Sequence, residues 1–323
     1  MRALPCRAGS RGAEGFKVAD RVAAPRFETA PGHLLRRAQQ VHTDLWSTIV
    51  GPELTGPQYG TLVAVAGWPE VDQKRAGELI SLDKSTTAGV VARLEKKGWL
   101  TRRPHPRDGR RRLLTLTDRA RANLPVWTSA AAQVQQDLLE PLDVDQAQEF
   151  IRQLQLVVFH SETEALSEAP IRTEPVVQLA GSPGYLIRRA QQVHATIWST
   201  VFGGDLTGPQ YAVMLAVANG ESIDQALIGA RASLDSSSVT DIVARLAEKG
   251  WLVRARDPVD RRRMRVRLTQ PAMTAMPHLS RSAQHVQDEL LRGLSADGPD
   301  EFIDRLRRVA RVNEPTRDLV AAG

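Results

Sequence analysis

Apolar residues recur at three- and four-residue spacing along residues 34–49, which predicts a helix with one buried face. These residues are Leu34, Leu35, Ala38, Val41, Leu45 and Ile49. The segment that follows, Leu54-Thr-Gly-Pro-Gln, predicts the start of a second helix that continues to about residue 66. Thr55 is suited to cap this helix, and Pro57 falls in its first turn, where a missing N–H costs little.

The same pattern occurs twice in the chain. Residues 32–42, GHLLRRAQQVH, return as residues 184–194, GYLIRRAQQVH, and the shift of 152 residues aligns both copies without insertion. Such self-similarity indicates two copies of one structural unit. We therefore expect a disordered basic tail over 1–31, a first domain over 32–166, a linker over 167–183 and a second domain over 184–323.

Two short helices joined by a tight turn are predicted within each unit, and this arrangement is typical of a helix-turn-helix. In the first unit they cover residues 73–80 and start again at Asp83. The second helix of the pair ends at Gly98 or Gly250, where glycine suits a C-cap. An arginine-dense hairpin follows, and arginine alternates with apolar residues along 263–268, which predicts the returning strand of a wing.

Beyond each wing, apolar residues at heptad-like spacing predict a long helix with an apolar seam. In the second unit they are Met276, Leu279, Ala283, Val286 and Leu290. Such seams need a partner surface, which the other unit can supply within one chain or between two chains. The predicted fold class is mainly α with small β-hairpin wings, as two tandem winged helix-turn-helix domains that form an intramolecular pseudo-dimer.

The net charge of the chain is +6, which favours an anionic binding partner. The only cysteine, Cys6, excludes an internal disulfide and a multi-cysteine zinc site. Runs of about eighteen apolar residues and an N-terminal apolar signal are absent from the sequence, so we expect a cytoplasmic protein without membrane contact. It also lacks a glycine-rich phosphate loop, a nucleophile elbow and a metal-spaced His/Cys set, so we expect no enzymatic activity, cofactor or metal.

The order of these elements resembles the MarR family of bacterial transcription regulators. Its most specific motifs here are the Asp-x-Arg of the wing and the Leu-Thr that closes its second strand: Asp108-Gly-Arg110 with Leu116-Thr117, and Asp260-Arg-Arg262 with Leu268-Thr269. The resemblance covers both repeats and leaves out the tail and the linker. Because members of the family are usually homodimers of one unit, it implies a dimer built into a single chain.

The resemblance also implies which residues meet double-stranded DNA. The family places the outward face of the second helix of the helix-turn-helix in the major groove, and the wing arginine, here Arg110 or Arg262, in the minor groove. The helix residues are then Lys84, Ser85, Thr86 and Thr87, and Ser236, Ser237, Ser238 and Thr240. The other wing residues of this surface are Arg107, Asp108, Arg111 and Arg112, and Asp260, Arg261 and Arg263.

The chemistry of these side chains supports DNA binding independently. A narrow minor groove attracts arginine by its negative potential, and short hydroxyl side chains let a helix approach base edges and phosphates closely. We expect Asp108 and Asp260 to hold the wing arginines by ion pairing. The alternatives are that the arginines are solvated surface charge and that the serines and threonines only start the helix.

In relatives that this chain resembles, small aromatic acids or related aryl ligands bind between the dimerisation helices and the DNA-binding lobe. The resemblance suggests two such pockets, built from Arg37, His42, Trp46, Gln58 and Tyr59, and from Arg189, His194, Trp198, Gln210 and Tyr211. The adjacent arginines Arg36 and Arg188 are equally able to neutralise an acid. The alternative is that both tryptophans are core residues and both histidines are interfacial polar groups.

These observations predict a sequence-specific transcription regulator, a repressor relieved by a small ligand. We call the second helix of each helix-turn-helix the reading helix. The two reading helices differ in sequence, for example where Lys84 of the first corresponds to Ser236 of the second, so we expect an imperfectly palindromic operator. The alternatives are an architectural or non-specific DNA-binding protein, a protein-interaction module on the same scaffold, or a regulator in which one half alone binds DNA. A monomeric pseudo-dimer and a homodimer of tandem chains are both open.

Overall fold

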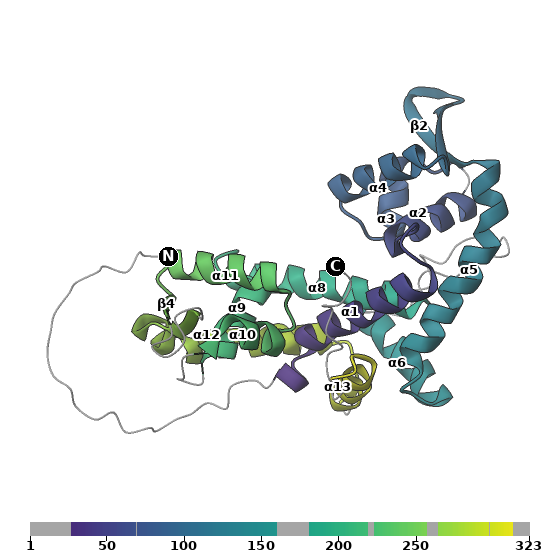
Figure 1. The fold of residues 1–323 in the computed structure, drawn as a ribbon. Helices are drawn as coiled ribbons and strands as arrows, with labels where there is room; N and C mark the ends of the chain where they lie inside the picture. Colours follow the sequence, from purple (N-terminus) through teal and green to yellow (C-terminus); the bar gives the residue numbers. More distant parts are fainter. Residues whose placement is uncertain are drawn as a thin grey trace, which may run out of the picture.

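The computed structural model describes residues 27–68, 70–159, 181–218, 223–256, 264–296 and 298–312 (Figure 1). The first half contains η1 (Phe27–Thr29), α1 (Pro31–Ile49), α2 (Gly56–Gly67), α3 (Gln73–Leu79), α4 (Lys84–Lys96), β1 (Leu100–His105), β2 (Asp108–Leu116), α5 (Asp118–Leu139) and α6 (Val144–Phe159). The second half contains α8 (Pro183–Phe202), α9 (Gly208–Val217), β3 (Ile223–Asp224), α10 (Gln225–Ala232), α11 (Ser236–Glu248), β4 (Leu252–Arg256), β5 (Met264–Leu268), α12 (Gln270–Leu291) and α13 (Gly298–Val309). The predicted linker residues 167–180 and tail residues 1–26 lie outside the described residues.

The mainly helical, tandem winged helix-turn-helix architecture predicted from the sequence is confirmed. Each wing is an antiparallel hairpin: Leu100 pairs with Leu116 in the first, and Leu252 with Leu268 in the second. Before each wing the chain passes through Gly98 or Gly250 at φ values of 70° and 73°, a conformation that an L side chain disfavours. Glycine stands after the reading helix, as predicted, because the backbone there requires a positive φ.

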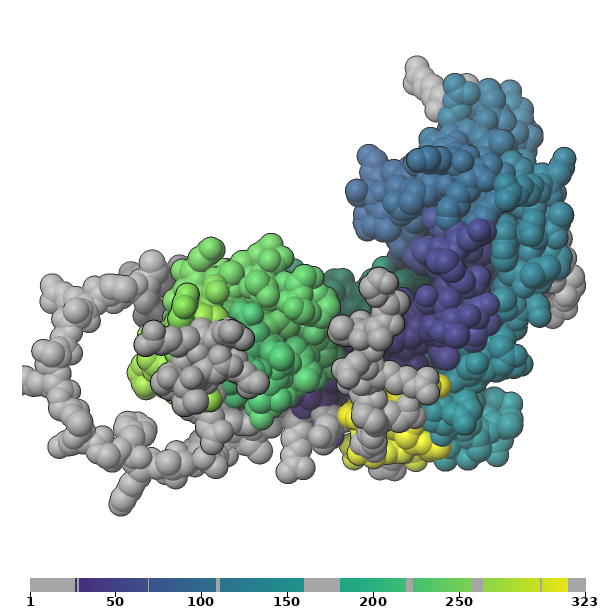
Figure 2. Space-filling view, in the orientation of Figure 1, coloured from purple at the N-terminus to yellow at the C-terminus, as the bar shows by residue number. Residues whose placement is uncertain are grey.

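Three apolar cores organise the molecule. One core fills the first lobe, which comprises α2, α3, α4 and the first wing, and another fills the second lobe, which comprises α9, α10, α11 and the second wing. The third core lies between the halves and combines buried residues of α1 and α6 with those of α8 and α13, including Phe150 and Phe302, whose rings stack at 5.7 Å. The lobes stand apart on the face that Figure 2 shows.

The long helices α5 and α12 connect these cores. Ala131 and Val134 of α5 belong to the core of the first lobe, whereas Leu138, one turn later, belongs to the shared core. In α12, Val286 and Leu290 divide in the same way. The apolar seams predicted from the heptad-like spacing are thus buried within a single chain: most of each seam packs in the core of its own lobe, and Leu138 and Leu290 at its end enter the core that both halves share.

The halves also interlock through a glycine and a histidine. The N–H of Gly184, at the start of α8, donates to Gln135 Oε1 at 2.8 Å, and the Gln135 amide nitrogen lies 3.4 Å from His42 Nε2. A Cβ added at Gly184 would lie 2.2 Å from His42 Nε2. The equivalent Gly32 approaches His194 equally closely. Only glycine lets these helix starts reach the histidine of the other half.

Residues 27–31, which the sequence assigned to the tail, are part of the fold. Phe27–Thr29 form the 3₁₀ helix η1, and Pro31 opens α1. The Phe27 ring lies 5.1 Å from that of His33 and packs against the core of the second lobe. The short segment gives no periodic signal, because its order comes from contacts with a lobe that is distant in the sequence.

Across the described ranges, no helix has both the length and the apolar character that crossing a bilayer requires.

The interlock predicts that Gly184→Ala destabilises the fold by about 1–3 kcal/mol, because the new methyl group overlaps the His42 ring. Denaturant unfolding measures the loss. Gly181→Ala is the matched control, since a Cβ there meets nothing within 4 Å. Adding His42→Ala to Gly184→Ala should make the two losses non-additive; strictly additive losses would show that the two residues are not coupled.

Candidate nucleic-acid interface and ligand pockets

The reading helix of the first half, α4, presents a polar start to solvent. Asp83 caps it by accepting from the Thr86 N–H at 2.9 Å and from the Thr86 hydroxyl. These hydrogen bonds hold the pKa of the Asp83 carboxyl below its usual value. Lys84, Ser85 and Thr86 are exposed. The first turn of α4 therefore offers one cation beside a fixed carboxylate.

In the second half, α11 starts in the same way with a different set of groups. Asp235 accepts from the hydroxyls of Ser237 and Ser238, both at 2.6 Å, and these hydrogen bonds lower the pKa of the Asp235 carboxyl. Thr240 is exposed and donates to the Ser236 carbonyl at 2.9 Å. Because these hydroxyl groups already donate their protons within the first turns of the helix, mainly their oxygen lone pairs remain free. The outward face therefore presents mainly hydrogen-bond acceptors. Acceptors suit the amino groups of cytosine and adenine in the major groove better than they suit phosphate.

The structure corrects one of the predicted DNA contacts. Thr87 is buried, 2% exposed, and donates to the Asp83 carbonyl at 2.8 Å. A Cβ at Gly77 would lie 2.5 Å from the Thr87 hydroxyl, so this threonine faces α3 instead of solvent. The sequence suggested an outward position because Thr87 continues a polar run, but one turn of helix brings the fourth residue onto the inner face.

The first wing is tied to the helix-turn-helix by an ion pair that the sequence did not predict. Arg111 Nη2 lies 2.8 Å from Asp72 Oδ2, and Asp72 is also the N-cap of α3. Arg107 and Arg112 are exposed. The predicted contacts of Asp260 and of Arg261, Arg262 and Arg263 lie outside the described residues, as does the side chain of Arg110, so the ion pairing expected of Asp108 and Asp260 stays a prediction.

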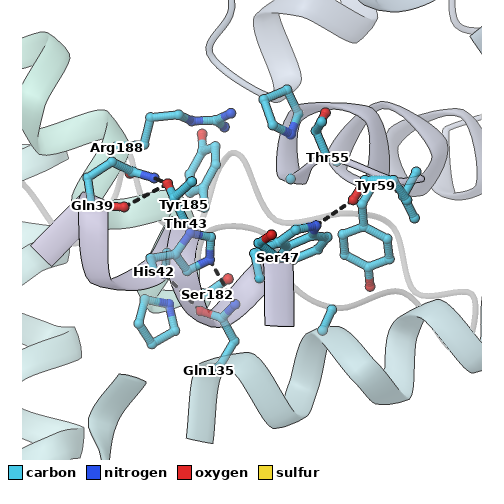
Figure 3. A pocket seen from close by; sticks show the side chains of 18 of the residues that line it. Gln39, His42, Thr43, Ser47, Thr55, Tyr59, Gln135, Ser182, Tyr185 and Arg188 are labelled. Atoms are coloured by element: carbon cyan, nitrogen blue, oxygen red, sulfur yellow. Dashed lines mark hydrogen bonds between the residues drawn. The ribbon is translucent and has the colours of Figure 1, made fainter. Parts of the chain in front are cut away.

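A cavity of about 740 Å³, the first pocket, lies where the first lobe meets the shared core (Figure 3). His42, Trp46 and Tyr59 line it from the first half, and Tyr185 and Arg188 line it from the second half. The Trp46 and Tyr59 rings are 5.4 Å apart, and Trp46 Nε1 donates to the Leu54 carbonyl. The pocket therefore has an aromatic wall and one cationic residue.

A second pocket, of about 670 Å³, occupies the equivalent place in the other half. His194, Trp198 and Tyr211 line it from the second half, and His33 and Arg36 line it from the first half. Both pockets thus bring together the histidine, tryptophan and tyrosine that the sequence grouped. Trp46, Trp198 and His42 are buried and His194 is half-buried, so these side chains line the pockets and also belong to the core or to the interface between the halves, as the alternative expected.

Four of the residues predicted for the pockets do not line them. Arg37 donates to the Ala310 carbonyl, and Arg189 donates to the Ser81 hydroxyl, so both leave the pockets to their neighbours Arg36 and Arg188. Consecutive helix positions point about 100° apart, and the sequence cannot say which of two arginines faces a cavity. Gln58 and Gln210 close the capping boxes of α2 and α9.

Each pocket arginine comes from the opposite half and also holds the turn of the neighbouring helix-turn-helix. Arg188 Nη2 donates to the Ile80 carbonyl at 2.5 Å, and Arg36 Nη2 donates to the Ala232 carbonyl at 2.9 Å. These carbonyls end α3 and α10, where a cation is favoured by the helix dipole. The Nε atoms of both arginines are buried and have no hydrogen-bond partner among the described residues.

The pocket histidines are held in the neutral state. Burial and the nearby charge of Arg188 lower the pKa of His42 from 6.5 to about 4, and burial and Arg36 do the same for His194. Gln135 Oε1 accepts from a backbone N–H, so its amide N–H₂ faces His42 Nε2, which must accept. The neutral imidazole then carries its proton on Nδ1.

The sequence of each half is similar to known transcription regulators. The MarR family matches residues 53–111 and again residues 204–263, which run from the start of the second helix into the wing of each half. The transcriptional regulator HosA of Escherichia coli O111:H- is 32% identical over 120 residues, which are 37% of this chain and 88% of HosA. The chain belongs to the MarR family.

Two further regulators are similar to part of this chain. The transcriptional repressor NicR of Pseudomonas putida is 32% identical over 104 residues, 32% of this chain and 66% of NicR. The PcaV transcriptional regulator of Streptomyces coelicolor, solved in complex with its natural ligand, is 38% identical, covers 43% of this chain and 98% of its own, and gives a TM-score of 0.40. Nearly the whole of HosA corresponds to one half of this chain, so this MarR-family protein carries two such units.

The histidine pKa values predict that acid destabilises the fold. In the unfolded chain these histidines bind protons near pH 6.5, but in the folded chain only near pH 4, so between these values the unfolded state binds more protons and stability falls as the pH falls. The free energy of unfolding should drop by about 2 kcal/mol per histidine from pH 7 to pH 5. Urea unfolding of His42→Gln and of the double variant with His194→Gln should show a shallower pH slope; an unchanged slope would assign the acid sensitivity to other groups.

Proposed function

We propose that this MarR-family protein represses transcription by binding one operator with both lobes, and that an aromatic acid in the pockets releases the operator. The observation that carries the proposal is the pair of arginines, Arg36 and Arg188, each with a buried Nε lacking a partner on a pocket wall. A buried donor without an acceptor is costly, and a carboxylate satisfies a guanidinium with two parallel hydrogen bonds. The aromatic walls supply apolar contact for a ring.

Release of DNA follows from the second bond of the same arginines. When a carboxylate binds Arg188, the guanidinium must turn toward it and weaken its hold on the Ile80 carbonyl, at the turn before the reading helix. The ligand therefore binds more tightly to conformations whose lobe positions do not fit the operator. This difference in affinity shifts the population of the protein away from the DNA-binding conformation. Repression is also supported by NicR, a relative that is a transcriptional repressor.

An operator with two different half-sites follows from the reading helices. Lys84 in α4 corresponds to Ser236 in α11, so one lobe presents a cation where the other presents a hydroxyl. Specific reading of bases separates this proposal from an architectural role, in which phosphate contacts dominate and random DNA competes nearly equally at physiological salt.

The test uses the operator recovered by selection from genomic fragments. Two symmetric versions, each carrying one half-site twice, should bind at least about tenfold more weakly than the natural site. In the variant Lys84→Ser the affinities of the two symmetric sites should approach each other. Equal affinity of all three sites for the unaltered protein would contradict asymmetric reading, and equal affinity for random DNA would contradict specific reading.

Acid release is tested with hydroxybenzoates in a DNA-binding titration followed by fluorescence anisotropy. The acid concentration that gives half-maximal release should be about tenfold or more higher for Arg188→Met than for the unaltered protein, because one carboxylate partner is lost. Arg189→Met is the matched control: it lies next to Arg188 on α8 but does not line the first pocket. Equal responses of the two variants would place the acid elsewhere.

A further inference from the structure

The two pockets are built from equivalent positions but are not chemically equivalent. Their tryptophans, tyrosines and arginines correspond one to one under the shift of 152 residues. Their linings differ at several positions: Asp288 and Asp300 line the second pocket alone, Thr43 of the first pocket is replaced by Ala195 in the second, and Tyr185 is replaced by His33. The last two differences change which hydrogen-bonding groups remain free beside the cavity.

In the first pocket, Thr43 fixes a glutamine that faces the same cavity (Figure 3). The Thr43 hydroxyl donates to the Gln39 carbonyl at 2.8 Å, so its oxygen can accept the Gln39 side-chain N–H₂, which lies 3.5 Å away. Gln39 Oε1 is then left buried and without a partner among the described residues. A buried amide oxygen of this kind calls for a donor on whatever fills the pocket.

In the second pocket the corresponding glutamine, Gln191, is held differently, and its Oε1 is not among the buried oxygens that lack a partner. Ala195 has no hydroxyl, and Gln191 Nε2 donates instead to the Leu35 carbonyl of the facing helix α1 at 2.8 Å. The arginine is also more fully engaged, since Arg36 Nη2 lies 3.3 Å from His33 Nδ1 as well as bonding the Ala232 carbonyl. Burial and the charges of Arg36 and Arg37 lower the pKa of His33 to about 3, so its imidazole is a neutral acceptor for that guanidinium.

In the first pocket no such competitor stands beside the arginine. The side chain at this position is Tyr185, whose hydroxyl lies 3.2 Å from the Ser81 hydroxyl, and the Arg188 guanidinium lies over the tyrosine ring at 5.6 Å. A ring face leaves the N–H groups of the guanidinium available, whereas the His33 nitrogen uses one of them. The first pocket thus combines a freer arginine with an unpaired acceptor.

We propose that the two pockets select different acids: the first is specific for an aromatic acid that also carries a hydroxyl donor, and the second binds acids with little regard for a hydroxyl. This inference rests on the proposed function, since it takes an aromatic acid as the ligand of both pockets. In one chain, a hydroxylated acid then fills the first pocket at a lower concentration than it needs to fill the second pocket.

The experiment compares benzoate with 3-hydroxybenzoate and 4-hydroxybenzoate on the full chain labelled with 5-fluorotryptophan. Trp46 reports on the first pocket and Trp198 on the second, and their ¹⁹F resonances are assigned with Trp46→Phe and Trp198→Phe. We expect the better hydroxybenzoate to shift the Trp46 signal at a concentration about tenfold or more below that of benzoate. The Trp198 signal should respond to both within about threefold.

Two variants examine the cause of the preference. Thr43→Ala gives the first pocket the residue of the second, frees the Gln39 amide and should remove most of the preference at Trp46. Thr48→Ala is the control, because Thr48 lies on the same helix with the same bond to the carbonyl four residues earlier, yet does not line the pocket. It should leave the preference unchanged.

The outcomes separate the two proposals. If both signals respond to the acids with the same preference, the pockets are equivalent and the inference is overturned, while acid binding stands. If Thr43→Ala and Thr48→Ala keep the same preference at Trp46, the role of Gln39 is overturned. If neither signal responds to any of the acids, the proposed ligand class fails together with the inference.

Discussion

The structure depends on burial of the apolar faces of α1 and α8 against each other and against α6 and α13. Both halves contribute to this shared core, which buries Leu34 and Leu186, Phe150 and Phe302 completely. Water exclusion from such area is the dominant favourable term in folding and association. Joining the halves in one chain makes this burial intramolecular, so the pairing no longer depends on protein concentration.

This pairing has a consequence for the sites. Because the starts of α1 and α8 cross into the opposite half, each pocket is completed by an arginine from the other repeat. The same two arginines bond the last carbonyls of α3 and α10. The pocket, the interface between the halves and the turn of the helix-turn-helix therefore share one arginine side chain in each half, and the proposed coupling between an acid and the position of a lobe rests on this shared side chain.

Covalent fusion also releases the halves from identity. In a homodimer every residue occurs at both equivalent places, whereas here Thr43 corresponds to Ala195, Tyr185 to His33 and Lys84 to Ser236. The apolar positions of the shared core have stayed similar, since both halves must fit one interior packed like a solid. The differences on the cavity walls and on the reading helices change the groups presented there without altering the apolar positions of the shared core.

The sequence by itself determined the repeat and the order of helices and wings, because these depend on periodicity, capping residues and local motifs. The histidine, tryptophan and tyrosine of each pocket were predicted from the resemblance to the MarR family. The sequence also suggested that a seam needed a partner. Only the tertiary structure decided that Arg36 and Arg188, and not Arg37 and Arg189, face the pockets, and that each serves the opposite half. It likewise placed Thr87 inside and Arg111 on Asp72. These assignments depend on how helices far apart in the chain pack together, and one-dimensional spacing carries no information about that packing.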